Sequence, residues 1–263
     1  MVRRSFRRHG RDREPIEVSA ERLIDTHCHV SAYTDPVAML READEAGVAV
    51  VAVTEDPEEY RRLRTRLGRR EHVEVALGLH PLRAASFGPN ELARFFRLVP
   101  QANWIGEVGL DYSRAGADTA KAQQRVFDVV LTEAQPGRHP LTVHSRGAEK
   151  DVVRRLADAG LPAILHWYTG PVNLAEEALQ AGLYFSVNIA MVRSRKFPSL
   201  MRAIPRDRIL LETDGPYAKD RGRPAQPGRL NELATALGTS WGTDRVETTN
   251  ILRANQTRFL NRA

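Results

Sequence analysis

The stretch Leu23-Ile24-Asp25-Thr26-His27-Cys28-His29 decides the fold that the sequence predicts. It has the pattern of a short apolar strand that ends in Asp-x-His-x-His. Alternation along a strand places His27 and His29 on one face, where both imidazoles can reach a single metal ion. Asp25 and Cys28 are then expected to lie outside the set of direct ligands. Taken alone, two histidines at a strand end fit ordinary packing as well as metal binding.

The length and composition favour one α/β barrel. A chain of 263 residues, of which 42% are hydrophobic, can bury a sizeable core, and such a barrel typically takes about 200–250 residues. The only cysteine, Cys28, excludes a disulfide framework and fits a reducing compartment. Its place beside the histidines favours packing over nucleophilic chemistry.

The charge balance suits an acidic partner such as nucleic acid. The formal net charge is +6 and the pI is near 9.8, although an arginine excess can also reflect codon usage. Residues 1–22 carry seven arginines and no periodicity, so they are expected to form a basic N-terminal extension. No apolar segment follows Arg3-Arg4 as in a secretion signal, and no run reaches membrane-spanning length. A cytoplasmic protein without membrane contacts is predicted.

From residue 23 onward, apolar strands alternate with amphipathic helices. The expected strands are 23–29, 48–53, 73–79, 104–108, 141–144, 163–166, 183–187 and 209–213. The expected helices are 36–47, 57–67, 89–98, 118–134, 147–160, 171–182, 226–238 and 244–262. Eight βα units of this length predict that residues 23–263 form a single TIM (β/α)8 barrel of the metal-dependent hydrolase type.

Six polar side chains fall at the carboxyl ends of these strands, where a barrel builds its active site. They are His27, His29, Glu107, His144, His166 and Asp214. Four imidazoles and two carboxylates exceed what one tetrahedral ion needs, but they suit two divalent ions bridged by a carboxylate. The set predicts His27, His29 and Asp214 on one ion, His144 and His166 on the other, and Glu107 on both.

Such a centre predicts hydrolysis by a metal-activated water, most naturally at a phosphodiester. Asp214 is placed to receive the proton of that water, so Glu107 and Asp214 are the expected catalytic residues. Imidazole-rich ligation favours Zn, Mn, Co or Ni over Mg, and the pattern does not select among them.

The ordered motifs resemble those of the TatD-type metal-dependent deoxyribonucleases from about Leu23 to the C-terminus. The matching segments are Asp25–His29, Gly78–Pro81, Gly106–Tyr112, His144–Arg146, His166 and Glu212–Tyr217. The resemblance implies a TIM barrel of the amidohydrolase type and a divalent-metal DNase, commonly one that trims single strands from the 3′ end.

Some segments depart from the common family pattern. Trp167-Tyr168-Thr169-Gly170 and Phe185-Ser186-Val187-Asn188 are similar to the TatD-like component of the bacterial Qat anti-phage defence system. Leu82 stands where a second histidine usually follows His80-Pro81. The resemblance to the defence-system component implies other proteins of such a system as partners. The departures leave the length and the strand polarity of the substrate open.

Six residues near the predicted mouth are candidates for substrate binding. Arg146 offers a planar donor fork to a phosphate, and Arg193 follows strand seven with the same chemistry. Trp167 and Tyr112, with Tyr168, have rings on which unpaired bases can stack, although aromatic loop residues are as often packing. His80 can orient a ligand or hydrogen-bond a phosphate.

Two other functions stay open. The same scaffold supports hydrolysis of a non-nucleic ester, lactone or amide, and a barrel can also serve assembly without catalysis. The full ligand set argues against the latter. No lysine follows a strand end where it could bridge metals as a carbamate, which argues mildly against a lactonase-like enzyme.

Overall fold

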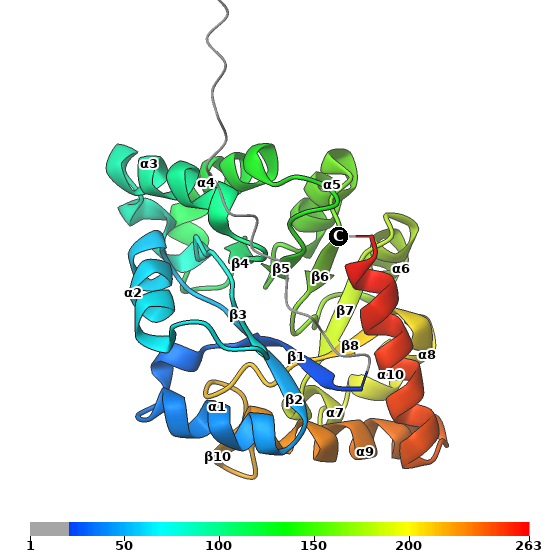
Figure 1. Ribbon diagram of the computed structural model, residues 1–263. Coiled ribbons are helices and arrows are strands. Elements are labelled where there is room, and N and C mark those ends of the chain that lie inside the picture. The colour runs from blue at the N-terminus through cyan, green and yellow to red at the C-terminus, as the bar shows by residue number, and fades with distance from the viewer. Residues whose placement is uncertain (1–20, 263) are drawn as a thin grey trace, which may run out of the picture.

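The computed structural model describes residues 21–262, and its centre is a parallel sheet that curls on itself (Figure 1). The strands are β1 (Leu23–Cys28), β2 (Val48–Ala52), β3 (Val73–Val75), β4 (Ile105–Gly109), β5 (Leu141–His144), β6 (Ala163–Leu165), β7 (Tyr184–Val187) and β8 (Ile209–Leu211). Their order in the sheet is β3-β2-β1-β8-β7-β6-β5-β4. The edges meet where Leu77 pairs with Ile105, and the Leu77 amide donates to the carbonyl of Trp104 at 3.0 Å. The predicted (β/α)8 fold class is confirmed.

Helices surround the sheet on its outer side (Figure 1). They are α1 (Pro36–Glu45), α2 (Pro57–Leu67), α3 (Pro89–Leu98), α4 (Ala120–Glu133), α5 (Glu149–Ala159), α6 (Val172–Gln180), α7 (Ile189–Val192), α8 (Phe197–Ala203), α9 (Leu230–Trp241) and α10 (Arg245–Leu260). Short 3-10 helices are η1 (Val30–Ala32), η2 (Pro81–Ser86), η3 (Val99–Gln101), η4 (Ala117–Thr119), η5 (Arg206–Arg208) and η6 (Pro227–Arg229). Two helices, α1 and α2, begin at an Asp-Pro pair. The carboxylate of Asp56, for example, accepts from the amides of Glu58 and Glu59 at 2.8 Å.

Three features differ from the expected element pattern. The helices α7 and α8 occupy the connection between β7 and β8, where no complete helix is predicted. A two-stranded hairpin, β9 (Lys219–Asp220) with β10 (Arg223–Pro224), follows β8. The third strand ends at Val75 and not at residue 79, although Leu77 still forms an isolated bridge with Ile105. Beyond it, Gly78 lies so close to Thr54 that a Cβ atom would stand 1.6 Å from the Thr54 carbonyl oxygen.

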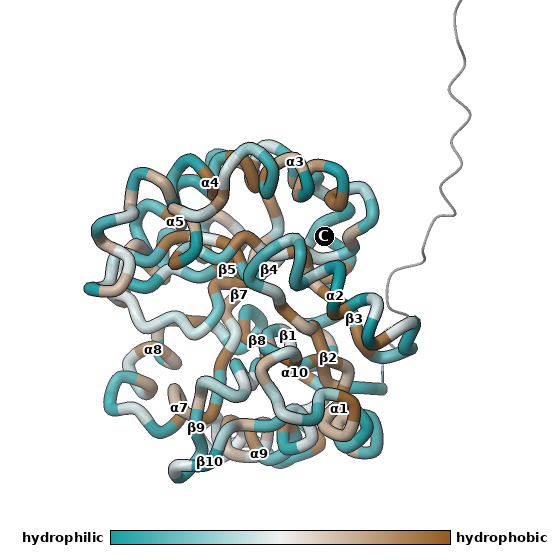
Figure 2. Tube along the Cα trace, turned by 90° about the vertical axis from the view of Figure 1, so that its left-hand side faces the viewer, coloured by the Kyte–Doolittle hydropathy of each residue, from teal (hydrophilic) through white to brown (hydrophobic). Residues whose placement is uncertain are grey.

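The buried apolar residues form an outer and an inner group. The larger group packs the strands against the helices, whereas the smaller group joins residues such as Val51, Ile164 and Leu210. In Figure 2, strands such as β2 are coloured as hydrophobic, whereas much of the surrounding chain is hydrophilic. Parallel strands covered on both faces are expected to be apolar throughout. The polar residues at their carboxyl ends therefore stand out as a site.

Irregularities in β1 and β4 orient the candidate site. Each strand has one residue more than its neighbour, between Asp25 and Cys28 in β1 and between Ile105 and Val108 in β4. An extra residue reverses the alternation of side chains. Asp25 and His27 are two residues apart, so regular alternation would place them on one face of the strand. The extra residue instead separates Asp25 from the face that carries the histidines. Its carboxylate instead accepts from the amide of Thr213 at 2.8 Å.

The predicted basic extension lies outside the described residues, except for Glu21 and Arg22. Its separation from the barrel stays a prediction. Within residues 21–262, no helix is both long enough and apolar enough to cross a membrane.

Candidate metal centre

Glu107, the central residue of β4, lies in the middle of the predicted ligand set. Its Oε2 atom is 3.4 Å from His27 Nε2 and 3.1 Å from His29 Nε2. Its Oε1 atom is 2.8 Å from His144 Nδ1 and 3.1 Å from His166 Nε2. The two carboxylate oxygens therefore face two different pairs of imidazoles. That geometry is what a carboxylate between two cations requires.

His27 is held in a form that suits a ligand. Its Nδ1 atom is 2.7 Å from the hydroxyl of Thr142 on β5, which leaves Nε2 directed at Glu107. Burial lowers the pKa of His27 to about 3, so the imidazole is neutral near pH 7. A neutral ring whose second nitrogen is hydrogen-bonded is the usual state of a metal-bound histidine.

His144 is oriented from behind by Asp111, which follows β4. The distance from His144 Nε2 to Asp111 Oδ2 is 2.8 Å, and the Ser113 amide donates to the same carboxylate. Burial opposes protonation of His144, but Asp111 and Glu107 outweigh it and raise its pKa. Asp111 keeps Nε2 occupied, so Nδ1 is the nitrogen available to a cation.

His166, at the end of β6, has a carboxylate on each side. Besides Glu107, the side chain of Glu212 on the β8 side lies 3.6 Å from His166 Nδ1. Glu212 is itself fixed, because it accepts from the Trp167 amide at 3.0 Å and from Asn188 Nδ2 at 2.9 Å. The ring of His166 also stacks on that of His27 with centroids 3.9 Å apart. These contacts fix the plane of His166 at the mouth.

His29 and Asp214 complete the opposite side. Asp214 Oδ1 is 3.5 Å from His29 Nε2 and 3.8 Å from His27 Nε2. The Asp214 amide donates to the His27 carbonyl at 2.8 Å, which joins the chain after β8 to β1. Burial raises the pKa of Asp214 to about 7. Its carboxylate therefore has an affinity for protons that suits a base near neutral pH.

The buried polar atoms at this site fit a cation. His27 Nε2 and Glu107 Oε2 are buried without any hydrogen-bond partner among the described residues. Such atoms are rare in native proteins, because a buried polar group without a partner costs free energy. Burial opposes ionisation of Glu107, yet the surrounding imidazoles, His80 first, together hold its pKa well below the usual value. An ionised carboxylate among imidazoles is a donor set suited to Zn or Mn.

Three overlapping groups of side chains can each hold a metal ion. They are His27 with His29 and Asp214, His27 with Glu107 and His166, and His80 with Glu107 and His144. In each group the ligand atoms lie within 4.8 Å of one another. The predicted six residues are thus brought together, and the division between two ions stays a prediction.

His80 lies closer to this centre than the sequence alone indicates. Its Nε2 atom is 3.4 Å from Glu107 Oε1, and its Nδ1 accepts from the Leu82 amide at 3.2 Å. An imidazole that accepts at Nδ1 carries its proton on Nε2 when neutral. In that form His80 can donate a hydrogen bond into the centre, and its role with a ligand or a phosphate stays a prediction.

The other predicted substrate contacts are dispersed around the mouth. Arg146 is exposed, and only its backbone is engaged, by the Tyr112 amide. The Tyr112 hydroxyl lies 3.0 Å from Asp151, so its tip is held by α5. Arg193 forms an ion pair with Asp220 of the β9–β10 hairpin. Trp167 is half-buried against the outer core.

Stacking of a base on Tyr168 is wrong, because this ring is only 1% exposed and its hydroxyl donates to the Pro171 carbonyl. The chain turns inward after β6 to pack the ring against Phe185.

Three residues without a predicted role contact the ring nitrogen of a histidine that faces away from Glu107. They are Thr142 at His27, Asp111 at His144 and Glu212 at His166. Asp111 and Glu212 belong to quoted motifs and lie within four residues of Glu107 and Asp214. Spacing from a proposed ligand is thus a signal that could have found them. Nothing in the sequence relates Thr142 to His27, because they meet only through the barrel.

We expect metal removal to inactivate the protein and to lower its thermal stability. Without a cation, Glu107 Oε2 and His27 Nε2 keep no partner in the core. Dialysis against a chelator should abolish hydrolysis and lower the melting temperature by several degrees, because a ligand that binds only the folded state stabilises it. Scanning calorimetry measures the melting temperature and a hydrolysis assay measures activity, each before and after Zn or Mn is restored. An unchanged melting temperature after complete metal removal would contradict a metal in this core.

Comparisons with known proteins find similar sequences and structures over most of the chain. A family model described as TatD related DNase matches residues 24–261. The human deoxyribonuclease TATDN3 is 32% identical over 74% of this chain and 78% of its own length. YabD of Bacillus subtilis, an uncharacterized metal-dependent hydrolase, is 29% identical over 82% of this chain and 89% of its own length. The crystal structure of YjjV, a TatD homolog from Escherichia coli, has a TM-score of 0.81 at 26% identity and covers 92% of this chain and 98% of its own.

Proposed function

The chain belongs to the family of TatD-related DNases, and from that premise we propose that this metal-dependent hydrolase cleaves phosphodiester bonds of DNA. One observation carries the proposal most strongly. The carboxylate of Glu107 divides its two oxygens between the pair His27 and His29 and the pair His144 and His166. Two cations held this way would lower the pKa of a shared water and polarise a phosphoryl oxygen.

The chain's own residues supply the remaining chemistry. Asp214, whose carboxylate lies beside His27 and His29, receives the proton of the attacking water. His80 donates from Nε2 to a non-bridging phosphate oxygen beside Glu107. Asp111 and Glu212 keep two imidazoles in the orientation that faces the substrate.

The test is an assay of metal-loaded protein on labelled single-stranded DNA, duplex DNA, RNA and a panel of small esters and lactones. We expect cleavage of DNA, with single strands preferred and with shortening from the 3′ end. Glu107→Ala protein prepared in parallel identifies contaminating nuclease. Turnover of an ester or lactone without DNA cleavage would overturn the proposal and favour the alternative hydrolase.

Arg146 is proposed to hold a substrate phosphate. Its guanidinium is exposed two residues beyond His144, and it forms no ion pair with the other described residues. Loss of one charge-assisted contact typically costs about 1.5–3 kcal/mol. We expect Arg146→Ala to lower kcat/KM on DNA roughly 10- to 100-fold. Arg146→Lys should have a kcat/KM between those of the wild-type protein and Arg146→Ala, because lysine supplies the charge without the bidentate fork.

Arg154→Ala is the matched control, because Arg154 is also exposed but lies on α5 and pairs with Asp151. Melting temperature and metal content should be normal in all three variants. DNA cleavage by Arg146→Ala at the wild-type rate would remove Arg146 from the substrate site.

A role in anti-phage defence, with other defence proteins as partners, is proposed from the resemblance of Trp167–Gly170 and Phe185–Asn188 alone. It predicts that cells carrying the gene in its native neighbourhood resist phage infection, and that Asp214→Asn removes the protection. Equal plaque numbers with and without the gene across a broad phage panel would contradict this role.

A further inference from the structure

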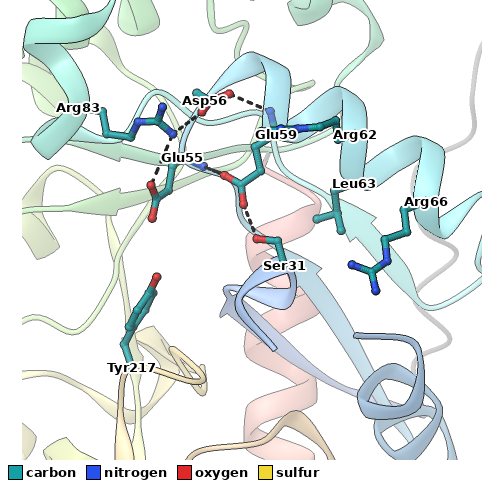
Figure 3. Close-up of a pocket in the computed structure, with 9 residues that line it drawn as sticks. All are labelled: Ser31, Glu55, Asp56, Glu59, Arg62, Leu63, Arg66, Arg83 and Tyr217. Carbon is teal, nitrogen blue, oxygen red and sulfur yellow. Dashed lines mark hydrogen bonds and ion pairs between the residues drawn. The ribbon is translucent and has the colours of Figure 1, made fainter. Parts of the chain in front are cut away.

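A groove of about 610 Å³ begins beside the candidate metal centre and follows α2 outward (Figure 3). We call it the α2 groove. Its lining residues are Ser31, Glu55, Asp56, Glu59, Arg62, Leu63, Arg66, Arg83 and Tyr217. The α2 residues among them lie on successive turns, so the groove runs along that helix. Its volume is typical of ligand sites, which measure about 300–1,000 Å³.

Tyr217 connects the α2 groove with the metal centre. Its ring meets the ring of His29 edge to face, with centroids 4.7 Å apart, and its amide donates to the Asp214 carbonyl at 2.9 Å. Nevertheless, the residue is 55% exposed. An exposed aromatic ring fixed next to a phosphodiester-cleaving site offers its free face to a base.

The acidic side chains of the groove are already engaged. Glu59 accepts from the Ser31 hydroxyl and from the Glu55 amide. Arg83 forms ion pairs with Asp56 and, at 3.7 Å, with Glu55. Figure 3 shows this network on the side of the groove toward Tyr217. Arg83 therefore compensates part of the acidic charge near the mouth, whereas Glu59 is held by neutral donors.

Farther out along the groove lies positive charge that has no acidic partner within residues 21–262. Arg62 and Arg66 are exposed and form neither an ion pair nor a side-chain hydrogen bond with the other described residues. They are four residues apart on α2, so their side chains lie on one face, about one turn from each other. Two unpaired guanidinium groups along a groove favour a ligand with repeated negative charges.

We infer that the α2 groove binds single-stranded DNA next to the scissile bond, with a base stacked on Tyr217 and backbone phosphates on Arg62 and Arg66. This inference rests on the proposed function. A duplex fits poorly, because its bases are already stacked and paired and cannot cover Tyr217 without unpairing. Stacking and phosphate contacts are tolerant of sequence, so the groove confers a preference for strandedness and length.

Binding and cleavage are measured separately to test the groove. The probe for binding is a fluorescein-labelled 20-nucleotide single strand, followed by anisotropy. The probe for chemistry at the metal centre is bis(4-nitrophenyl) phosphate, which is too small to reach from the centre to Arg66. The ratio of kcat/KM on the strand to kcat/KM on this small diester isolates the contribution of the groove.

We expect Arg62→Gln/Arg66→Gln to weaken strand binding about 10- to 100-fold and to lower the ratio by a similar factor. The slope of log Kd against log salt should decrease by about 1.4, since each phosphate contact to a single strand contributes about 0.7. Arg97→Gln/Arg202→Gln is the matched control. It removes the same charge near the ends of α3 and α8, which lead into β4 and β8 at the opposite end of the barrel.

Tyr217 is tested through the conservative variant. Tyr217→Ala should weaken strand binding about 10-fold or more, whereas Tyr217→Phe keeps the ring and should bind almost as wild type. Metal content, measured in each variant, shows whether His29 has moved.

The proposed function and the groove fail in different ways. If the wild-type protein binds the strand through these residues but does not cleave it, the nuclease function is wrong and the groove stands. If the double variant binds like its control, or if the wild-type protein does not bind the strand, the groove assignment is overturned. Equal affinity for a duplex, with equal loss in Tyr217→Ala, overturns the choice of single strands.

Discussion

Glu107→Ala should reduce DNA hydrolysis to background, a loss on the order of 10³-fold or more, and should lower metal occupancy at both predicted positions. The reason is geometric. Glu107 is the only residue whose side-chain oxygens lie within 3.4 Å of nitrogens from His27, His29, His144 and His166 among residues 21–262. Without it, imidazoles only 3.2 Å apart remain with no anion between them. Elemental analysis of the purified variant, with an assay on labelled DNA, measures both losses.

Glu176→Ala provides the control, because Glu176 is an exposed glutamate on α6. It should keep wild-type activity and metal content. Two ions still bound to Glu107→Ala, together with near-normal hydrolysis, would exclude Glu107 as the bridge.

Asp214→Asn should keep the fold and much of the metal but lose turnover, by roughly 10²- to 10⁴-fold in kcat. An amide oxygen can still coordinate, but it cannot accept the proton of the attacking water. The backbone at Asp214 has φ of 46°, a left-handed conformation that asparagine tolerates well. The substitution therefore tests the proton acceptor without disturbing the turn after β8.

Single-turnover kinetics over pH 5–9, with metal content determined on the same samples, measures this loss. The Asp214→Glu variant, measured in parallel, tests whether a displaced carboxylate restores part of the rate. Full turnover by Asp214→Asn with an unchanged pH profile would assign the base to another residue.

The barrel and its ligand set were predictable because they depend on local patterns. Continuous apolar runs such as Val48–Val53 indicate strands covered on both faces, and polar residues at their ends indicate the mouth. The inward direction of Glu107 depends on an irregularity in β4 that no pattern in the sequence signals. The sequence thus predicts which residues form the site better than it predicts how they are arranged.

The substrate side was less predictable because its contacts join distant segments. The hydroxyl of Tyr112 is held by Asp151, and Arg193 is paired with Asp220, so two expected substrate contacts already have protein partners. The α2 groove joins Tyr217 to Arg66, which lie in separate βα units. Spacing along the chain cannot relate such residues, since only the closure of the barrel brings them together.

The most direct test of the account is anomalous diffraction from crystals of the wild-type protein loaded with Zn or Mn, recorded at the absorption edge of that metal. We expect two peaks about 3.5–4 Å apart on either side of the Glu107 carboxylate. One peak should lie toward His27, His29 and Asp214, and the other toward His144 and His166. A protein that cleaves DNA yet shows no anomalous peak beside Glu107 would contradict the account.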